Sequence, residues 1–231
     1  MKKVNIYFLC IVFLMNITST YSQGKAKAKV SGTITMPVMQ NKQRVFRGRM
    51  YRNRLSASKK SKQKHDALKS SYVDIIVSAK PLSFNYKTKP LPPVKILQVN
   101  AAFIPRVVPV TPGTEVQFIN RDKFFHNVFS ITPGSRFNIG RKPTGNIVGQ
   151  KIIKLGETKL FCDIHAQMNA TIICINTPYI TRVRADGRFQ LSDLPAGKYQ
   201  LQIYHPDLDN ISQVIRVEAG DAINLNFTLN R

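Results

Sequence analysis

Short runs of alternating apolar and polar residues occupy most of the chain after residue 28. In Lys29–Met36, apolar residues recur at every second position apart from a glycine, which is typical of a half-buried strand. Pro-Gly, Asp-Gly and Ala-Gly pairs separate such runs, and no helical period of useful length occurs. The pattern predicts an all-β protein built from β-sandwiches. The predicted strands are Lys29–Met36, Tyr72–Ala79, Val94–Val99, Arg106–Val110, Glu115–Asn120, Asn127–Thr132, Lys151–Leu155, Lys159–Cys162, Thr171–Asn176, Tyr179–Arg184, Arg188–Leu191, Lys198–Tyr204, Gln213–Val217 and Ala222–Leu229.

The first 22 residues follow a different pattern. Lys2 and Lys3 precede an apolar run, Ile6–Met15, and Thr20 and Ser22 stand where a signal peptidase expects small residues. The run of about 10 residues is too short to span a bilayer. The alternative is a buried strand of the mature fold. We predict a signal peptide over 1–22 and an exported protein, periplasmic or secreted to the cell surface, without a transmembrane segment in the mature chain.

Charge changes this picture in one region. The 231 residues include 35 Lys and Arg against 12 Asp and Glu, a net charge of +23, which first suggests a nucleic-acid partner. Export argues against that, and we expect no nucleic acid. The segment 42–69 holds 11 basic residues and one acidic residue. We interpret this basic segment either as a solvated insertion without a partner or as a dock for an anionic surface, an acidic glycan or an acidic redox partner.

The segment Phe161–Ala170 carries the clearest chemistry. Cys162, His165 and Met168 stand in a C-x2-H-x2-M spacing just after a predicted strand. A thiolate, an imidazole and a thioether together are ligands that copper prefers, whereas a thioether is not a zinc preference. His126, at the start of another strand, qualifies as a fourth ligand. The sequence therefore predicts one copper site, with His126, Cys162 and His165 in a trigonal plane and Met168 as a weak axial ligand.

Cys174 lies in the strand that follows the motif. We interpret it as a buried core thiol, although export would permit a disulfide with Cys162, which would destroy the copper site. His205 is expected to shape a turn and not to bind metal.

The motif residues also carry a family resemblance. His126-Asn127 followed by Cys162, His165 and Met168 resembles the type-1 (blue) copper site of cupredoxins such as amicyanin, pseudoazurin and plastocyanin. The chain from 94 to 178 is similar to bacterial cupredoxin-like proteins labelled methylamine utilisation or plastocyanin-like. The resemblance implies a Greek-key cupredoxin β-sandwich over 94–178.

The surroundings of the predicted ligands lead to further expectations. Asn127 is expected to link the two ligand loops through a backbone hydrogen bond. Ile164 and Ala166 would form an apolar rim around the edge of His165 through which electrons pass. Asp163, which departs from the family pattern, adds negative charge beside the metal and is expected to lower its reduction potential.

The C-terminal stretch 179–231 resembles a second family. Asp186-Gly187 and the phrase from Leu194 to Tyr199 look like the carboxypeptidase-regulatory-like or prealbumin-like β-sandwich, a small immunoglobulin-like fold. Two strands usual at the start of that fold are missing here, but Val30–Ile34 and Val73–Val77 look like them. One hypothesis therefore inserts the cupredoxin into the small sandwich; the alternative is two successive domains. Residues 23–93 hold the N-terminal strands, the basic segment and a proline-rich linker.

Three functions are compatible with these residues. The first is an exported blue-copper electron carrier with a redox partner protein, and it is not an enzyme. The second is a copper-binding or storage protein without redox turnover. The third is a structural or glycan-binding β-protein with a vestigial copper site. An oxidase or reductase subunit is disfavoured, because the sequence shows no second cluster of copper ligands.

Overall fold

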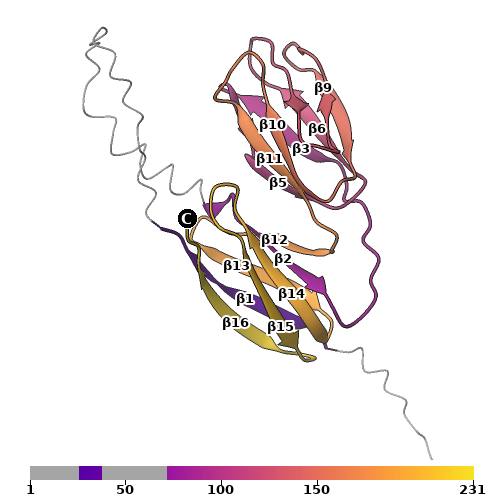
Figure 1. The fold of residues 1–231 in the computed structure, drawn as a ribbon, viewed down its shortest axis with the longest axis vertical. Helices are drawn as coiled ribbons and strands as arrows, with labels where there is room; N and C mark the ends of the chain where they lie inside the picture. Colours follow the sequence, from indigo (N-terminus) through magenta and orange to yellow (C-terminus); the bar gives the residue numbers. More distant parts are fainter. Residues whose placement is uncertain (1–25, 38–71) are drawn as a thin grey trace, which may run out of the picture.

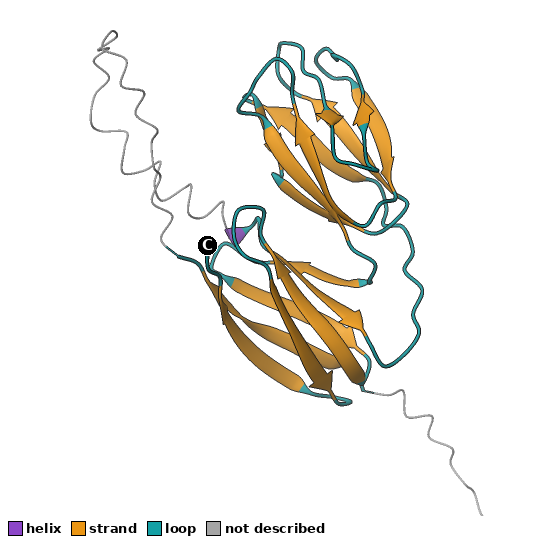
Figure 2. Cartoon of the chain, viewed as in Figure 1, coloured by secondary structure: helices purple, strands orange, loops and turns teal. Residues whose placement is uncertain are grey.

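The protein consists almost entirely of β-strands arranged in two sandwiches (Figures 1 and 2). The computed structural model describes residues 26–37 and 72–231. The predicted signal peptide and the basic segment 42–69 lie outside the described residues. No helix of the described residues is long and apolar enough to cross a membrane. The all-β fold class predicted from the sequence is confirmed.

Residues 94–174 form one sandwich, called here the inserted sandwich. One sheet has the order β4-β3-β6-β9, and the facing sheet has the order β5-β11-β10-β7-β8. Side chains such as Ile96, Phe118 and Leu160 fill the space between the sheets and are almost fully buried. The strands are β3 (Val94–Val99), β4 (Ala102–Ile104), β5 (Val107–Val110), β6 (Thr114–Asn120), β7 (Phe129–Ser130), β8 (Phe137–Asn138), β9 (Ile147–Ile152), β10 (Gly156–Phe161) and β11 (Asn169–Cys174).

The other sandwich, called here the split sandwich, is assembled from both ends of the chain. One sheet has the order β13-β1-β16 and the other the order β12-β2-β14-β15. Thr33 pairs with Arg188 on one side and with Asn226 on the other, so a strand near the N-terminus lies between two C-terminal strands. The strands are β1 (Ala28–Thr35), β2 (Ile76–Pro81), β12 (Tyr179–Arg182), β13 (Arg188–Leu194), β14 (Gly197–Tyr204), β15 (Ile211–Val217) and β16 (Ala222–Thr228).

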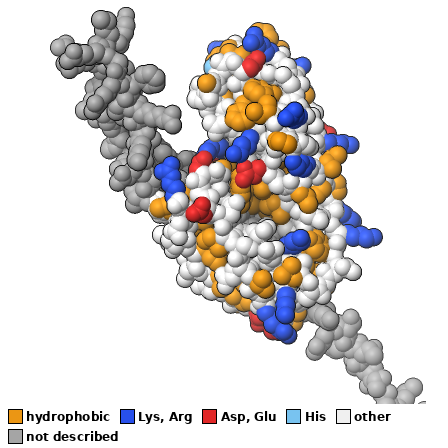
Figure 3. Space-filling model, viewed as in Figure 1, with side chains coloured by type: hydrophobic (Ala, Val, Ile, Leu, Met, Phe, Trp, Pro, Cys, Tyr) orange, Lys and Arg blue, Asp and Glu red, His pale blue; other side chains and the backbone are white. Residues whose placement is uncertain are grey.

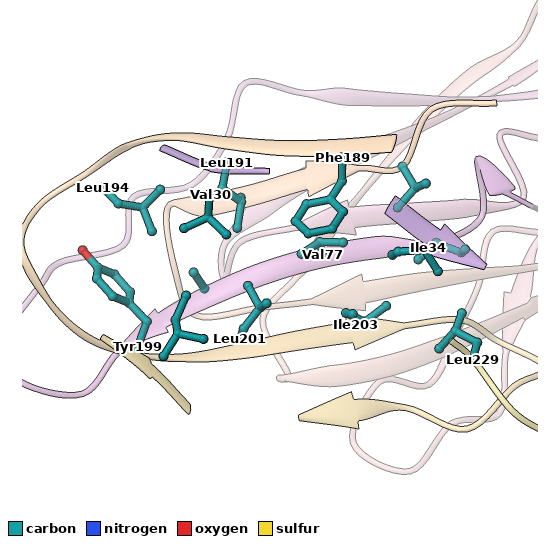
Figure 4. Packing of buried hydrophobic residues seen from close by; sticks show 14 of the residues in the cluster. Val30, Ile34, Val77, Phe189, Leu191, Leu194, Tyr199, Leu201, Ile203 and Leu229 are labelled. Atoms are coloured by element: carbon teal, nitrogen blue, oxygen red, sulfur yellow. The ribbon is translucent and has the colours of Figure 1, made fainter. Parts of the chain in front are cut away.

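The core of the split sandwich follows from the alternating pattern. Val30, Val77 and Leu201 point inward from three different strands, and Tyr199 belongs to the same buried cluster and lies at one end of the side chains drawn in Figure 4. The Tyr199 hydroxyl donates a hydrogen bond to the Pro195 carbonyl oxygen (2.6 Å), so this buried aromatic side chain keeps a partner for its polar end. Because one core contains side chains from β1, β2 and β14, the two pieces of this sandwich fold as one unit.

The observed ends of several strands differ from the predicted ones by two to four residues, and three cases are instructive. The strand predicted at Lys151–Leu155 is wrong beyond Ile152, because β9 starts earlier, at Ile147, and the chain turns before β10. Ile153 and Leu155 are therefore exposed despite being apolar. Residues 72–75 turn, with the Ile75 amide donating to the Tyr72 carbonyl, so β2 starts only at Ile76. β7 spans only Phe129–Ser130.

Two strands were missed from the sequence altogether. β4 has three residues and β8 has two, which is too short for an alternating pattern to be recognised.

Charged and apolar contacts join the two sandwiches. Arg106 of the inserted sandwich donates to Asp74 (3.4 Å) and Asp207 (2.7 Å) of the split sandwich. In the reverse direction, Arg182 donates to the Val107 carbonyl oxygen. A separate apolar cluster of buried side chains fills the space beside these contacts: Ile76, Val107, Ile173 and Tyr204. The two sandwiches therefore share a small core of their own.

Asp74 is a buried carboxylate of this interface that depends on the positive charge of Arg106. Its side chain is only 7% exposed. Burial raises the pKa of Asp74, while the charges and hydrogen bond of Arg106 oppose that rise. A buried carboxylate that loses its cation is destabilising, because its charge remains desolvated.

We predict that Arg106→Ala lowers the free energy of unfolding at neutral pH by about 1–3 kcal/mol, because Asp74 keeps its charge but loses its closest cation. The loss should shrink as the pH falls through the raised pKa of Asp74, since the protonated carboxyl needs no cation. Urea unfolding at several pH values measures both effects. Lys27→Ala, which removes the exposed ion pair with Asp193, is the control and should cost less than about 0.5 kcal/mol. Equal losses in the two variants would contradict the role of Asp74.

Candidate metal centre

His126 lies in the loop between β6 and β7 and is completely buried. Two backbone hydrogen bonds with Lys142 hold its main chain, one from each amide to the other residue's carbonyl. Its Nε2 atom lies 2.7 Å from Oδ2 of Asp122. An ionised carboxylate can only accept, so Nε2 carries the proton and Nδ1 keeps its lone pair free. The ring is therefore held in the orientation and tautomer that a metal ligand needs.

Cys162 and His165 lie in the loop between β10 and β11. These strands pair with Phe161 opposite Asn169, so the seven residues between them form one tight connection. The Met168 amide donates to the His165 carbonyl oxygen (2.9 Å) and closes a turn inside the loop. Cys162 is buried and His165 is half-buried. The loop thus presents one ligand to the interior and one near the surface.

The potential ligand atoms surround a common point. Sγ of Cys162 lies 3.9 Å from Nδ1 of His126 and 3.9 Å from Nδ1 of His165. All three atoms lie within 4.8 Å of one another. Bonds of about 2.3 Å to sulfur and about 2.0 Å to nitrogen, as in zinc sites, separate such atoms by about 3.7 Å when they are about 120° apart. The three side chains therefore fit a single metal ion of this size. Among residues 26–37 and 72–231 no other group of three His, Cys or acidic side chains shows this spacing.

Met168 and Asn127, the other two predicted site residues, are buried. Met168 is 1% exposed and belongs to the same buried cluster as Cys162, so its thioether lies in the apolar interior beneath the ligand loop. Asn127 follows His126, and its Oδ1 atom has no hydrogen-bond partner among the described residues. The linking role of Asn127 stays a prediction.

Asp122 is a site residue that the sequence reasoning missed. Burial raises its pKa, but hydrogen bonds from the Ala101 amide, the His126 ring and the Asn100 amide outweigh burial and lower it. Asn100 and Ala101 both have positive φ angles, so the β3–β4 turn aims both of its amides at this carboxylate. The sequence did contain one signal that could have identified Asp122, namely a carboxylate four residues before a predicted histidine ligand.

Phe124 is the second residue that was missed. Its ring centroid lies 5.0 Å from that of His126 and 5.3 Å from that of His165, and the two imidazoles are 4.8 Å apart. Phe124 and Ile164 are both more than 40% exposed, although they are large apolar side chains. The half-exposed His165 therefore lies in an apolar patch, to which Phe124 adds a ring beyond the predicted Ile164 and Ala166.

Asp163 has a partner that offsets its charge. Nε of Arg141, in the loop that precedes β9, lies 3.2 Å from Oδ2 of Asp163. The contact joins the ligand loop to the loop that also fixes His126 through Lys142. The negative charge that was expected to lower the reduction potential is thus paired with a cation at the surface.

The other cysteine and histidine of the described residues, Cys174 and His205, have structural roles. Cys162 and Cys174 are both free and buried, so they form no disulfide. Burial raises the pKa of the Cys174 thiol to about 11, which keeps it protonated and unreactive at neutral pH. Nδ1 of His205 accepts a hydrogen bond from the Asp207 amide (3.1 Å), which agrees with the expected turn.

Comparisons with known proteins gave structural similarity alone. No protein-family model and no curated protein matches the chain. Amicyanin from Paracoccus versutus is 17% identical, with 38% of this chain and 92% of that chain covered and a TM-score of 0.33. A purple cupredoxin from Nitrosopumilus maritimus is 20% identical, with 36% and 99% covered and a TM-score of 0.33. A copper-containing nitrite reductase from Thermus scotoductus is 26% identical, with 42% of this chain but only 26% of that chain covered and a TM-score of 0.36.

We predict that Asp122→Asn weakens metal binding by about 10- to 100-fold, because the His126 ring loses the carboxylate that orients it. Titration with Co(II) or Cu(II), followed by visible absorption, measures the affinity. Asp163→Asn is the matched control, since it removes a carboxylate beside Cys162 that does not touch either imidazole. An affinity unchanged in Asp122→Asn, or equally reduced in both variants, would contradict the role assigned to Asp122.

Proposed function

We propose that the protein is an exported type-1 (blue) copper protein that carries single electrons. The observation that supports this most directly is that the Cys162 Sγ atom lies 3.9 Å from each of two imidazole Nδ1 atoms, with all three atoms within 4.8 Å of one another. The buried Met168 thioether in the same cluster adds the soft, weak ligand that distinguishes a blue-copper set from a zinc set. Export belongs to the proposal and depends on the pattern of residues 1–22.

The site residues would have different roles in binding the metal. His126, Cys162 and His165 would bind the ion directly, and Met168 would supply a fourth, weaker ligand. Copper bound there supplies a one-electron Cu(II)/Cu(I) couple. Asn127 would support the two ligand loops from its buried position next to His126.

The surrounding protein limits how far these ligands move. The carboxylate of Asp122 and the backbone of Lys142 hold His126, and the register of β10 with β11 holds the ligand loop. Because the ligands lie in a packed core, they cannot rearrange freely when the charge at the site changes. When the ligands move little between the two oxidation states, electrons exchange rapidly and neither oxidation state is trapped.

His165 offers the route for electrons into and out of the site. Its ring is half-buried, while His126 is completely buried, so only His165 lies near solvent. Phe124 and Ile164 surround it with apolar surface that a partner protein can cover and that excludes water when covered. This patch is the feature that favours a carrier over the second candidate, a copper storage protein, which needs no contact surface beside its ligand.

The partner is a redox protein, and the basic character of the chain favours an acidic one. Basic side chains are spread over the visible face of both sandwiches (Figure 3). Arg121 and Lys123 lie in the loop that carries His126, Lys142 pairs with His126 through its backbone, and the basic segment 42–69 adds further positive charge. Such charge speeds the encounter with an acidic surface.

We predict that Cu(II) added to the purified protein produces an intense blue thiolate-to-copper absorption band, which Cys162→Ser abolishes. Cys174→Ser is the matched control, because Cys174 is also a buried free thiol but lies at the far end of β11, about 17 Å along the strand from Asn169, where the ligand loop ends. The band should survive in that variant. Tight, colourless binding of Cu(I) without a blue Cu(II) form would support the storage function, and no copper binding would contradict both.

A further inference from the structure

β16 is an edge strand with one side unpaired. It pairs with β1 in parallel from Ala222 opposite Lys29 to Thr228 opposite Thr35. No described residue pairs with its other side, and it lies at the outer edge of the split sandwich (Figure 1). An unpaired strand edge leaves a row of amide and carbonyl groups that can pair with another strand.

β16 also lacks the features that usually protect an edge. Its sequence, from Ala222 to Thr228, contains no charged residue, no proline and no glycine. The other edge strands of the described sheets are each short, charged or interrupted. β4 has three residues and β8 has two, and the others carry Pro109 in β5, Lys151 in β9, Arg182 in β12, Arg188 in β13 and Arg216 in β15. In a chain of net charge +23, an uncharged seven-residue edge stands out from the rest.

The side chains of β16 are incompletely covered by their own sandwich. Ile223, Leu225 and Phe227 face the core but remain partly exposed, and they alternate with the exposed Asn224 and Asn226. The Phe227 ring reaches Phe189 at a centroid distance of 6.3 Å, so one side of it is packed. Apolar surface at the open edge would be buried if the sheet continued.

The strand is complementary to itself in the antiparallel direction. With a two-fold axis at Leu225, Ile223 would lie opposite Phe227 of a second copy, and Asn224 opposite Asn226. Apolar side chains then meet on the core face and amides meet on the outer face, and no like charges are opposed. Two strongly basic molecules repel each other over most of their surface, so an uncharged, self-complementary edge is where a second copy can approach.

We propose that the protein forms a dimer in which β16 pairs antiparallel with β16 of a second copy, joining the sheets β13-β1-β16 of both copies into one continuous sheet. The contact is the same patch on both molecules, as a two-fold interface requires. It lies in the split sandwich, so it leaves the ligand loops of the inserted sandwich free for a redox partner.

Sedimentation equilibrium of the purified protein tests the dimer, which should show twice the monomer mass. Two double variants test the register. N224K/N226K places lysine opposite lysine twice and should weaken the dimer by at least about 100-fold, since like charges across an interface cost several kcal/mol. N224D/N226K places aspartate opposite lysine twice and should keep the dimer. Both variants lose the Thr33 hydrogen bonds to Asn226, so they differ only at position 224.

A second measurement uses the unaltered protein, so the test does not depend on the folding of the variants. Amide hydrogen exchange of the unaltered protein should slow in β16 as concentration rises through the dimer range, with no matching change in the ligand loop. A protein that is monomeric at all concentrations would overturn the proposal and leave the edge to a strand of another protein. A dimer that persists in N224K/N226K, or β16 amides insensitive to concentration, would overturn it as well.

Discussion

The orientation of the His126 ring is the constraint on which the candidate metal centre depends. Asp122 accepts a hydrogen bond from the Nε2–H group and so leaves Nδ1 directed at Cys162, while the backbone of Lys142 fixes the position of the residue. Asp122 is itself held by the amides of the β3–β4 turn. The β3–β4 turn, which lies beside the end of β6, thereby determines how the ring of the ligand that follows β6 is oriented. The hydrogen bond between His126 and Asp122 is buried, so water does not compete with it.

The ligand loops of the inserted sandwich lie away from its interface with the split sandwich. The inserted sandwich contacts the split sandwich through Arg106 and Val107 at the start of β5 and through Ile173 near the end of β11. The ligand loop lies at the beginning of β11, before Asn169. Contacts that stabilise the pair of sandwiches therefore do not cover the apolar patch around His165, and the split sandwich keeps its outer edge at β16 for other contacts.

The sequence predicted the elements that depend on local pattern. Strands with clear alternation, such as β3 and β14, were expected within one residue of their observed ends. The strand predicted through Leu155 failed because its apolar residues lie in an exposed turn, where hydrophobicity carries no information about pairing. Asp122 and Phe124 were overlooked for a related reason, since their roles come from contacts with ring atoms that no spacing rule describes.

The sequence by itself determined the chemistry of the candidate site, because Cys162, His165 and Met168 share one short loop whose spacing is a local property. Only the tertiary structure decided that His126, 36 residues from Cys162, meets that loop at 3.9 Å. It also decided that β1 lies between β13 and β16, which are about 160 and about 190 residues further along the chain. Such pairings depend on which strands share a core. Whether a side chain is buried by a distant strand depends on the whole fold, and the residues next to that side chain in the sequence do not determine it.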